Sequence, residues 1–292
     1  MPKVSIGLPV YNGENFIEES IDSLLNQTFD DFELIICDNS STDSTKDICK
    51  NFVAQDCRVS YYSNDKNYGA AYNYNKTFKL STGRYFKWMS HDDICAPTFL
   101  ERCINVLDQE SFVVLSYPKT AIIDENGKII SYHEDNLHLH SLAPHLRLRN
   151  FFRKPAGCNA VFGLMRSQIL SKTKLIGPFE SSDHNLLLEL SLLGKFWEVP
   201  EHLFFRRYHP QMSRRICTLS SDYARWFDSS YAGLNRLPVI KLLHELVKSI
   251  QNSPISFTEK FLCFVELIRA TFILSSKALI WIKARADQNR MY

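Results

Sequence analysis

The stretch Val4-Ser-Ile-Gly-Leu-Pro-Val10 is a compact apolar run with the length of a buried strand. The residues after it, 14–27, place apolar side chains at helical spacing, at Phe16, Ile17, Ile21, Leu24 and Leu25. The alternation continues, with strands expected at 32–37, 58–62 and 85–89 and helices at 42–54 and 70–80. Strands that alternate strictly with helices predict a mainly parallel α/β sheet with helices on both faces.

Three segments with polar side chains lie at the carboxyl ends of these expected strands. They are Pro9-Val-Tyr-Asn12, Asp38-Asn39 and Ser90-His-Asp-Asp93. In parallel sheets, ligands bind beyond the carboxyl ends of the strands. We therefore expect these three loops to converge on one crevice.

Asp92 and Asp93 are adjacent carboxylates next to a strand that should be buried. Neighbouring carboxylates repel each other and resist desolvation unless a cation joins them. Hard divalent ions such as Mg²⁺ and Mn²⁺ take oxygen ligands and typically bring a phosphate with them. The alternative is a solvated turn, or a cap for a helix that starts near Pro97. The pair is therefore a candidate metal site.

The composition describes an ordinary globular protein with an uneven distribution of charge. The chain has 292 residues, 45% hydrophobic and 23% charged, enough for one large domain or one domain with an appendage. Residues 203–292 carry 14 Lys/Arg against 6 Asp/Glu, a net charge of +8, which leaves −6 for residues 1–202. This division favours a metal-using site in the acidic part and an anionic surface partner for the basic tail. We expect no nucleic-acid partner.

The eight cysteines are scattered and contain no C-x-x-C pair. Their neighbours are mostly apolar, so we expect buried free thiols, which are typical of a reducing compartment. The apolar run at Val4 is too short for a signal peptide and begins a strand. We therefore expect a cytoplasmic protein, with contact at the inner face of the membrane as a further possibility.

Five segments carry a resemblance to a known family. They are Leu8-Pro-Val-Tyr-Asn-Gly-Glu14, Ile36-Cys-Asp-Asn-Ser-Ser-Thr-Asp43, Asn67-Tyr-Gly-Ala-Ala-Tyr-Asn73, Gly83-Arg-Tyr and Ser90-His-Asp-Asp93. Their order and spacing resemble those of family 2 glycosyltransferases over roughly residues 3–210. The resemblance implies the GT-A fold, a nucleotide-diphosphate sugar donor, and a divalent cation, Mn²⁺ or Mg²⁺. It also implies a glycan or lipid-linked glycan as the acceptor.

The resemblance assigns roles at the donor end. Asp38 would accept hydrogen bonds from the nucleobase, although an aspartate there can instead cap the next helix. Pro9, Tyr11 and Asn12 would line the nucleoside. Asn67, also placed at the nucleotide, and Asn73 are typical of residues that organise a loop backbone. The family usually shows Asp-x-Asp, and here Ser90 replaces the first aspartate.

Further roles follow for the metal and the diphosphate. Asp92 would hold the ion and contact the nucleotide, with Asp93 as a second ligand. The segment around His209 resembles the family's Tyr-Arg-x-His-Pro sequence, which makes this histidine a third ligand, although a histidine before a proline is often structural. Arg206 and Arg207 suit bidentate contacts with a pyrophosphate.

The acceptor side offers a candidate base, because attack by a sugar hydroxyl benefits from proton removal. Asp183 opens an expected helix and resembles the family's Glu-Asp motif, with Ser182 in place of the glutamate. The alternative is that Asp183 only stabilises the helix N-terminus. His184 is the second candidate base, and Arg166 is a candidate contact for an anionic group.

We expect a GT-A domain at 1–215, with a nucleotide-sugar-binding half at 1–95 and an acceptor half at 96–215, followed by a basic helical region at 216–292. Three charges between Phe261 and Ile282 argue against a membrane span. The helix there would pack on the domain or mediate homo-oligomerisation. Alternatively, residues 256–292 would contact a membrane surface through Trp281, Lys283 and Arg285.

The sequence thus predicts an inverting, metal-dependent glycosyltransferase. One alternative is a catalytically silent module that binds a nucleotide sugar, since Ser90 and Ser182 depart from the family pattern. Another is a dinucleotide-dependent oxidoreductase, which is disfavoured because no G-x-G-x-x-G follows the first strand.

Overall fold

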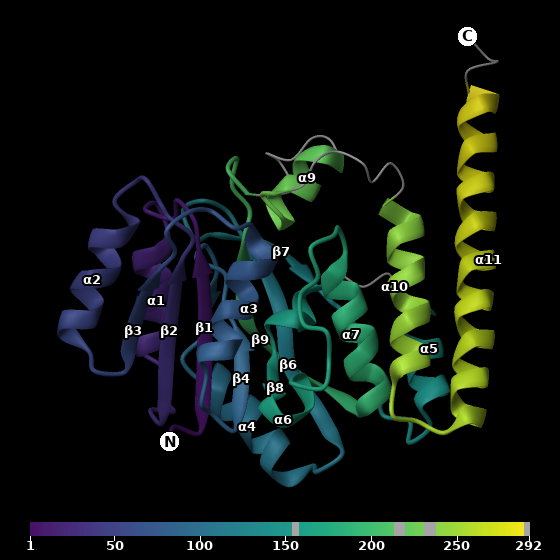
Figure 1. Cartoon of the computed structure of the whole chain (residues 1–292), viewed down its shortest axis with the longest axis horizontal. Coiled ribbons are helices and arrows are strands. Elements are labelled where there is room, and N and C mark those ends of the chain that lie inside the picture. Colours follow the sequence, from purple (N-terminus) through teal and green to yellow (C-terminus); the bar gives the residue numbers. More distant parts are fainter. Residues whose placement is uncertain (154–157, 213–219, 231–237, 289–292) are drawn as a thin grey trace.

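The computed structural model describes residues 1–153, 158–212, 220–230 and 238–288. Its centre is a nine-stranded sheet in the order β3-β2-β1-β4-β8-β6-β9-β5, with β7 paired to β6. Figure 1 shows this sheet between α2 at one end and α11 at the other. The predicted α/β architecture is therefore confirmed.

The first four strands form a parallel block. The strands are β1 (Val4–Val10), β2 (Phe32–Asp38), β3 (Val59–Ser63) and β4 (Tyr85–Trp88), and the helices between them are α1 (Ile17–Leu25), α2 (Thr45–Gln55) and α3 (Ala70–Leu80). Every residue of β1 is buried, as expected for a central strand covered on both faces. The periodicity of the sequence predicted each of these elements to within a few residues.

Alternate side chains of the parallel strands enter two separate cores. Val4, Ile6 and Leu8 of β1 pack with α1, whereas Phe86 and Trp88 of β4 pack on the opposite face. Each fully buried aliphatic side chain of this kind contributes about 1.5–3 kcal/mol to folding. Gly7 faces α3 at close range, because a Cβ at this position would lie 2.7 Å from Thr77 Cβ of that helix. The absence of a side chain here allows α3 to pack directly on β1.

The second half of the sheet is mixed. Its elements are β5 (Ile94–Cys95), α4 (Phe99–Gln109), β6 (Val113–Ile123), β7 (Ile129–His133), α5 (Pro144–Arg153), the 3₁₀ helix η1 (Cys158–Phe162), β8 (Leu164–Arg166), α6 (Ser167–Leu170), α7 (Ser182–Leu193) and β9 (Lys195–Arg207). Strand β8 is antiparallel to β4 and β6, whereas β9 runs parallel to β6. Strict alternation of strands and helices therefore ends after β4.

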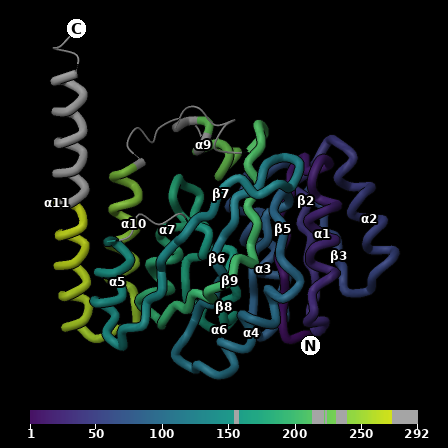
Figure 2. The backbone as a smooth tube through the Cα atoms, turned by 180° about the vertical axis from the view of Figure 1, so that it is seen from behind, coloured from purple at the N-terminus to yellow at the C-terminus, as the bar shows by residue number. Residues whose placement is uncertain are grey.

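The described elements after β9 are helices: α9 (Ser220–Phe227), α10 (Pro238–Asn252) and α11 (Phe257–Gln288). Leu246 and Ile250 of α10 and Cys263 and Leu267 of α11 are buried in the core that contains α5 and α7. Figures 1 and 2 show α10 and α11 side by side next to α5. Part of the basic tail is thus packed on the domain.

The same helices also present apolar side chains to solvent. Phe257, Phe261, Ile268 and Phe272 of α11 are exposed. No helix within the described residues is both long enough and apolar enough to cross a membrane. The side chains of Trp281, Lys283 and Arg285, on which the expected membrane contact depended, lie outside the described part of the structure.

Seven of the eight cysteines fall within the described residues, and no disulfide joins any two of these seven. Cys57 is exposed and the other six are buried, as expected for structural thiols. Cys217 lies outside the described residues.

Candidate active site

A cavity of about 890 Å³ opens at the carboxyl ends of β1, β2 and β4. Its walls come from the loops after these strands, with further residues from η1, the start of α7, the end of β9 and α9. The three loops therefore converge as predicted. The volume is in the range of about 300–1,000 Å³ that is typical of small-molecule sites.

The loop after β1 forms the expected donor end of this cavity. Pro9, Tyr11 and Asn12 all line it. Asn12 has a φ of 51°, and its Oδ1 accepts a hydrogen bond of 2.9 Å from the Thr42 N–H. The Asn12 N–H in turn donates to Ser41 Oγ. These contacts hold the loops after β1 and β2 against each other, and Tyr11 stays 44% exposed at the opening.

Asp38 is not brought into the cavity. Its Oδ1 accepts hydrogen bonds from the Ser41 N–H and hydroxyl, and its Oδ2 accepts one of 2.6 Å from the Tyr61 hydroxyl. The side chain is 1% exposed, and Asn39 lines the cavity instead. Asp38 thus organises the turn after β2 and does not cap the next helix, because α2 begins at Thr45 after Ser44.

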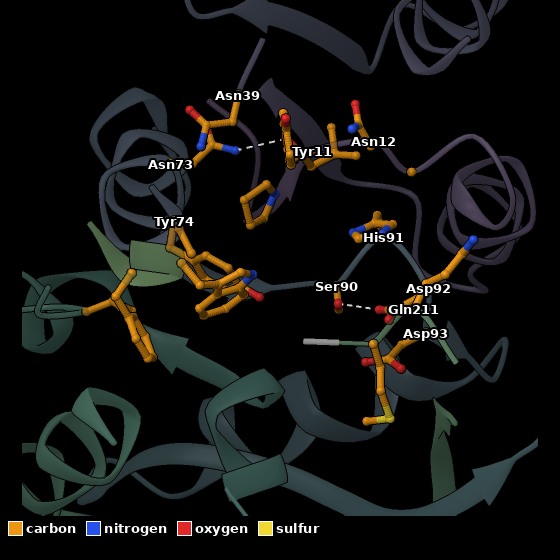
Figure 3. Close-up of a pocket in the computed structure, with 18 of the residues that line it drawn as sticks. Tyr11, Asn12, Asn39, Asn73, Tyr74, Ser90, His91, Asp92, Asp93 and Gln211 are labelled. Carbon is orange, nitrogen blue, oxygen red and sulfur yellow. Dashed lines mark hydrogen bonds between the residues drawn. The ribbon is translucent and has the colours of Figure 1, made fainter. Parts of the chain in front are cut away.

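Four asparagines form a network beneath the donor end. Asn39 Nδ2 donates to Asn67 Oδ1 and to the Gly69 carbonyl, while Asn64 Nδ2 donates to Asn39 Oδ1. Asn73 Nδ2 donates to the carbonyls of Val10 and Cys37, at the ends of β1 and β2. Figure 3 shows Asn39 and Asn73 next to each other and to Tyr11. Asn67 lines the cavity, but its amide oxygen organises the loop backbone.

Asp92 lines the cavity next to His209. Its Oδ2 is 3.0 Å from His209 Nε2, and its Oδ1 accepts a hydrogen bond from the Ser90 hydroxyl, a pair drawn in Figure 3. Burial raises the pKa of Asp92, but His209, His91 and Ser90 together lower it below its usual range. Asp92 is therefore ionised at neutral pH. Ser90, the residue that departs from the family pattern, supports this charge.

Asp93 has the opposite character. Its side chain is 3% exposed, and its Oδ1 accepts a hydrogen bond of 2.9 Å from the Arg207 N–H of β9. Burial and the neighbouring charge of Asp92 raise the pKa of Asp93 well above its usual range. Two adjacent carboxylates cannot both carry a charge in a buried site without a cation. Asp93 can offer only its second oxygen to an ion.

The geometry of Asp92 and His209 fits a divalent cation. Two neighbouring ligands of an octahedral ion with bonds of about 2.1 Å lie about 3.0 Å apart, and this is the distance from Asp92 Oδ2 to His209 Nε2. The same distance suits a direct hydrogen bond, which holds the groups together without an ion. His209 Nδ1 is buried, and no described residue bonds to it. The carboxylate donors suit Mn²⁺ or Mg²⁺.

Asp183 lies in the first turn of α7 and lines the same cavity. Its Oδ1 is 3.3 Å from His184 Nδ1, and Cys158 Sγ is 3.0 Å from the same nitrogen. Burial raises the pKa of Asp183, but hydrogen bonds and charge from His184 outweigh it and lower the pKa. Asp183 is thus an ionised, partly exposed carboxylate. Ser182, next to it, is buried.

The arginines divide into structural and accessible groups. Arg207 is 2% exposed and donates to Glu19 and to the carbonyls of Asp92, Asp124 and Glu125, so its guanidinium is committed to the protein.

The other predicted arginines differ from each other. Arg166 donates to the carbonyls of Val113, Leu107 and Glu110 and is not among the cavity residues. Arg206 lines the cavity and is held by Asn159 Oδ1. Arg225 of α9 also lines the cavity and was missed, because no local pattern connects a residue so far along the chain with this pocket.

Residues 5–173 match the sequence pattern of glycosyl transferase family 2. An uncharacterised glycosyltransferase of Haemophilus influenzae is 30% identical over 226 residues, covering 74% of this chain and 68% of that protein. An uncharacterised glycosyltransferase of Rickettsia typhi is 38% identical over 127 residues, covering 43% of this chain and 39% of that protein. The chain thus matches less than half the length of the Rickettsia protein.

Solved structures share the fold. TarS residues 1–349 of S. aureus, in complex with UDP-GlcNAc, gives a TM-score of 0.69 at 17% identity, covering 92% of this chain and 72% of that one. The mannosyltransferase PcManGT of Pyrobaculum calidifontis, in complex with GDP-Man and Mn²⁺, gives 0.55 at 14% identity, covering 100% and 81%. The fold is therefore of the GT-A type, as the motifs predicted. With its loops gathered at the ends of the parallel strands and a family match over residues 5–173, the chain belongs to glycosyl transferase family 2.

Proposed function

We propose that this protein is an inverting, divalent-metal-dependent glycosyltransferase. It would move a sugar from a nucleotide-diphosphate donor to a hydroxyl of a glycan or lipid-linked glycan. The observation that carries the proposal is that one cavity contains both the Asp92–His209 pair and the ionised Asp183. Membership of the family leaves the dinucleotide-dependent oxidoreductase without support.

The donor end would bind the nucleotide. Tyr11 offers an exposed aromatic ring, and Asn12 and Pro9 complete the wall beside it. The names of two structural neighbours include UDP-GlcNAc and GDP-Man, which supports a donor of this class. The hydrogen-bonded asparagines below would keep the loops in place without contacting the base.

Asp92 and His209 would hold the cation, with the free oxygen of Asp93 as a further ligand. When bound, the ion would stabilise the charge that develops on the leaving diphosphate. Arg206 and Arg225 line the same cavity and would add positive charge beside that group. A structural neighbour in complex with Mn²⁺ supports this choice of metal.

Asp183 would act as the general base. Its lowered pKa keeps the carboxylate ionised at neutral pH, so it is ready to accept the proton of an acceptor hydroxyl. The hydroxyl oxygen would then attack the anomeric carbon from the face opposite the diphosphate. A single displacement of this kind inverts the configuration at that carbon.

A second candidate function is donor binding without turnover. It is motivated by Ser182, which stands where the family's base motif has a glutamate and whose hydroxyl is buried without a hydrogen-bond partner among the described residues. In that case the protein would bind a nucleotide sugar as a scaffold. Measurement of turnover separates the two functions.

The first experiment is a thermal-shift screen of nucleoside diphosphates and their sugars, with and without Mn²⁺. A ligand that binds only the folded state raises the melting temperature. We expect a rise that needs both the nucleotide and the metal, and its loss in Asp92→Ala. If no diphosphate changes the melting temperature at any metal concentration, the proposal fails.

The second experiment tests the base. With the donor found by the screen, Mn²⁺-dependent hydrolysis or transfer is measured for Asp183→Asn and for Glu180→Gln, which changes another acid of the same cavity. We expect Asp183→Asn to lose about 10²–10⁴-fold in rate while the donor-induced melting shift stays, and Glu180→Gln to lose much less. The opposite ranking would move the base to Glu180. Proton NMR of the first product formed would show inversion or retention.

The exposed apolar side of α11 would support either self-association or contact with the inner face of a membrane. Phe257, Phe261 and Phe272 are its aromatic members. Flotation with anionic liposomes and light scattering of the free protein would separate the two. Phe261→Ser, which changes an exposed side chain only, should reduce whichever association occurs.

A further inference from the structure

Cys158, Asp183 and His184 form a cluster at the acceptor end of the cavity, separate from the Asp92–His209 pair. One donor atom from each of the three lies within 4.8 Å of the other two. All three residues line the cavity, which gives a small ion a path to them. They combine a thiol, a carboxylate and an imidazole, the donors that Zn²⁺ uses most in proteins.

The distances suit a small tetrahedral ion. With bonds of about 2.3 Å to sulfur and 2.0–2.1 Å to nitrogen and oxygen, tetrahedral ligands lie about 3.4–3.6 Å apart. Cys158 Sγ is 3.0 Å from His184 Nδ1, and Asp183 Oδ1 is 3.3 Å from that nitrogen. An ion would therefore need these two pairs to move apart by roughly 0.1–0.6 Å. The sulfur and oxygen atoms, the third pair, lie within 4.8 Å of each other. Three protein ligands leave the fourth position open to the cavity.

The elements that carry the ligands are well anchored. Cys158 begins η1, and the next residue, Asn159, accepts a hydrogen bond from Arg206 of β9. Asp183 and His184 belong to the first turn of α7, which packs directly on η1. The cluster therefore combines ligands from two packed elements, and its spacing does not depend on one mobile loop.

A different arrangement would be expected for a nucleophilic cysteine. A relay of thiol, imidazole and carboxylate places the thiol on one ring nitrogen and the carboxylate on the other. Here Cys158 Sγ is almost equally far from both ring nitrogens, at 3.0 and 3.1 Å, and Asp183 approaches Nδ1, the same nitrogen as the thiol. The relay arrangement is therefore not the one formed here, and the three donor atoms lie within 4.8 Å of one another, as a ligand set requires.

We propose that Cys158, Asp183 and His184 form a second metal site, selective for thiophilic ions such as Zn²⁺, whose occupation blocks the acceptor end of the cavity. Thiolate and imidazole favour Zn²⁺ and Co²⁺, whereas the oxygen-rich donor site suits Mn²⁺ and Mg²⁺. Binding releases the thiol proton to solvent. The inhibitory consequence rests on the proposed role of Asp183 as the base; the binding itself does not.

The test uses Co²⁺ as a spectroscopic substitute for Zn²⁺ in the full-length chain, in the presence of Mg²⁺ to fill the donor site. We expect a near-ultraviolet charge-transfer band from thiolate to cobalt, which Zn²⁺ removes by displacement. Cys158→Ser should abolish the band, and Cys57→Ser, which changes the exposed cysteine, should leave it intact. Asp183→Asn should keep the band but weaken Co²⁺ binding by at least about tenfold.

Circular dichroism and the Mn²⁺-dependent nucleotide melting shift confirm that each variant is folded. No charge-transfer band in the unaltered chain, or a band that survives Cys158→Ser, overturns the second metal site. A cobalt band in a protein that binds no nucleotide would instead refute the proposed function and leave the site standing. In an active enzyme, Zn²⁺ should lower turnover without removing the donor-induced melting shift.

Discussion

Asp135 is a buried carboxylate whose ionisation should oppose folding at neutral pH. Its side chain is 2% exposed, with His133 Nε2 at 3.4 Å from its Oδ1. Burial raises its pKa, a hydrogen bond from the Asn159 N–H lowers it, and the charge of Glu198 raises it again, so that the pKa moves from 3.8 to about 7. The folded protein therefore holds this proton at a pH where the unfolded chain has released it.

The sign and size of the effect follow from linkage. Between pH 3.8 and about 7 the folded state binds the additional proton, so the free energy of unfolding falls by about 1.4 kcal/mol for each pH unit. This loss of unfolding free energy is absent well below pH 4 and complete above about pH 7, where it amounts to about 4 kcal/mol. Over the accessible interval from pH 5 to pH 8, the same relation gives a loss of about 2–3 kcal/mol.

Asp135→Asn keeps the shape of the side chain and removes its ionisation. Urea unfolding is followed by tryptophan fluorescence and by circular dichroism at pH 5 and pH 8, with coincident transitions required before free energies are compared. We expect the unaltered chain to lose about 2–3 kcal/mol relative to Asp135→Asn between these two pH values.

The control is Asp31→Asn, which removes an exposed carboxylate and should follow the unaltered chain. Asp92 and Asp183 have lowered pKa values, so their ionised carboxylates stabilise the folded state at neutral pH. This stabilisation is lost only as the pH falls towards their pKa values in the folded state, and the loss is the same in the unaltered chain and in Asp135→Asn. If Asp135→Asn and the unaltered chain change in parallel from pH 5 to pH 8, Asp135 is ionised in the folded state and the reasoning is wrong.

Three further predictions concern packing and the metal. Gly7→Ala should destabilise the protein by about 1–3 kcal/mol in urea unfolding, because its Cβ would collide with Thr77 and Phe86; an unchanged midpoint would show that α3 moves freely. Arg207→Lys should cost at least about 2 kcal/mol, because lysine cannot replace contacts to Glu19 and three carbonyls. Chelation by EDTA should abolish the nucleotide-induced melting shift and Mn²⁺ should restore it; a shift insensitive to EDTA would show that Asp92 and His209 hold no ion during donor binding.

The parallel half of the fold could be predicted from the sequence because its signals are local. Strand β1 has the predicted bounds, Val4–Val10, and helix α3 has the predicted span, 70–80. In this half each strand or helix is followed closely in the sequence by the next one. Hydrophobic periodicity alone is therefore enough to locate each element and to tell helices from strands. The loops at the carboxyl ends of the strands then follow from the parallel arrangement alone.

The mixed half was not predictable in the same way. Strand β8 lies between β4 and β6, and β9 pairs with β6 across more than one intervening helix. Such pairings depend on contacts between residues far apart in the sequence, which no local period records. The same applies to α9, which adds Arg225 to the cavity, and to Cys158, whose role depends on its approach to α7.

The residue pair Asp38 and Asn39 shows where the candidate site departs from expectation. Asp38 ends β2 and Asn39 follows it, and family resemblance favoured the aspartate for contact with the nucleobase. In the structure the carboxylate meets Tyr61 from β3, the adjacent strand, and the asparagine faces the cavity. The pairing of β2 with β3 brings the Tyr61 hydroxyl to this carboxylate.

The two acids that first marked the metal site are adjacent in the sequence, yet their pKa values move in opposite directions. His209, just after β9, lowers the pKa of Asp92, whereas burial and the charge of Asp92 raise the pKa of Asp93. The hydrogen bond from the Arg207 N–H to Asp93 opposes that rise without cancelling it. Because Arg207 also donates to the Asp92 carbonyl, the position of β9 fixes both carboxylates at once. A substitution at Arg207 should therefore weaken Mn²⁺ binding as well as stability, even though its guanidinium makes no contact with the Asp92 carboxylate. A variant that is destabilised but binds Mn²⁺ with unchanged affinity would show that the acid pair holds its geometry without β9.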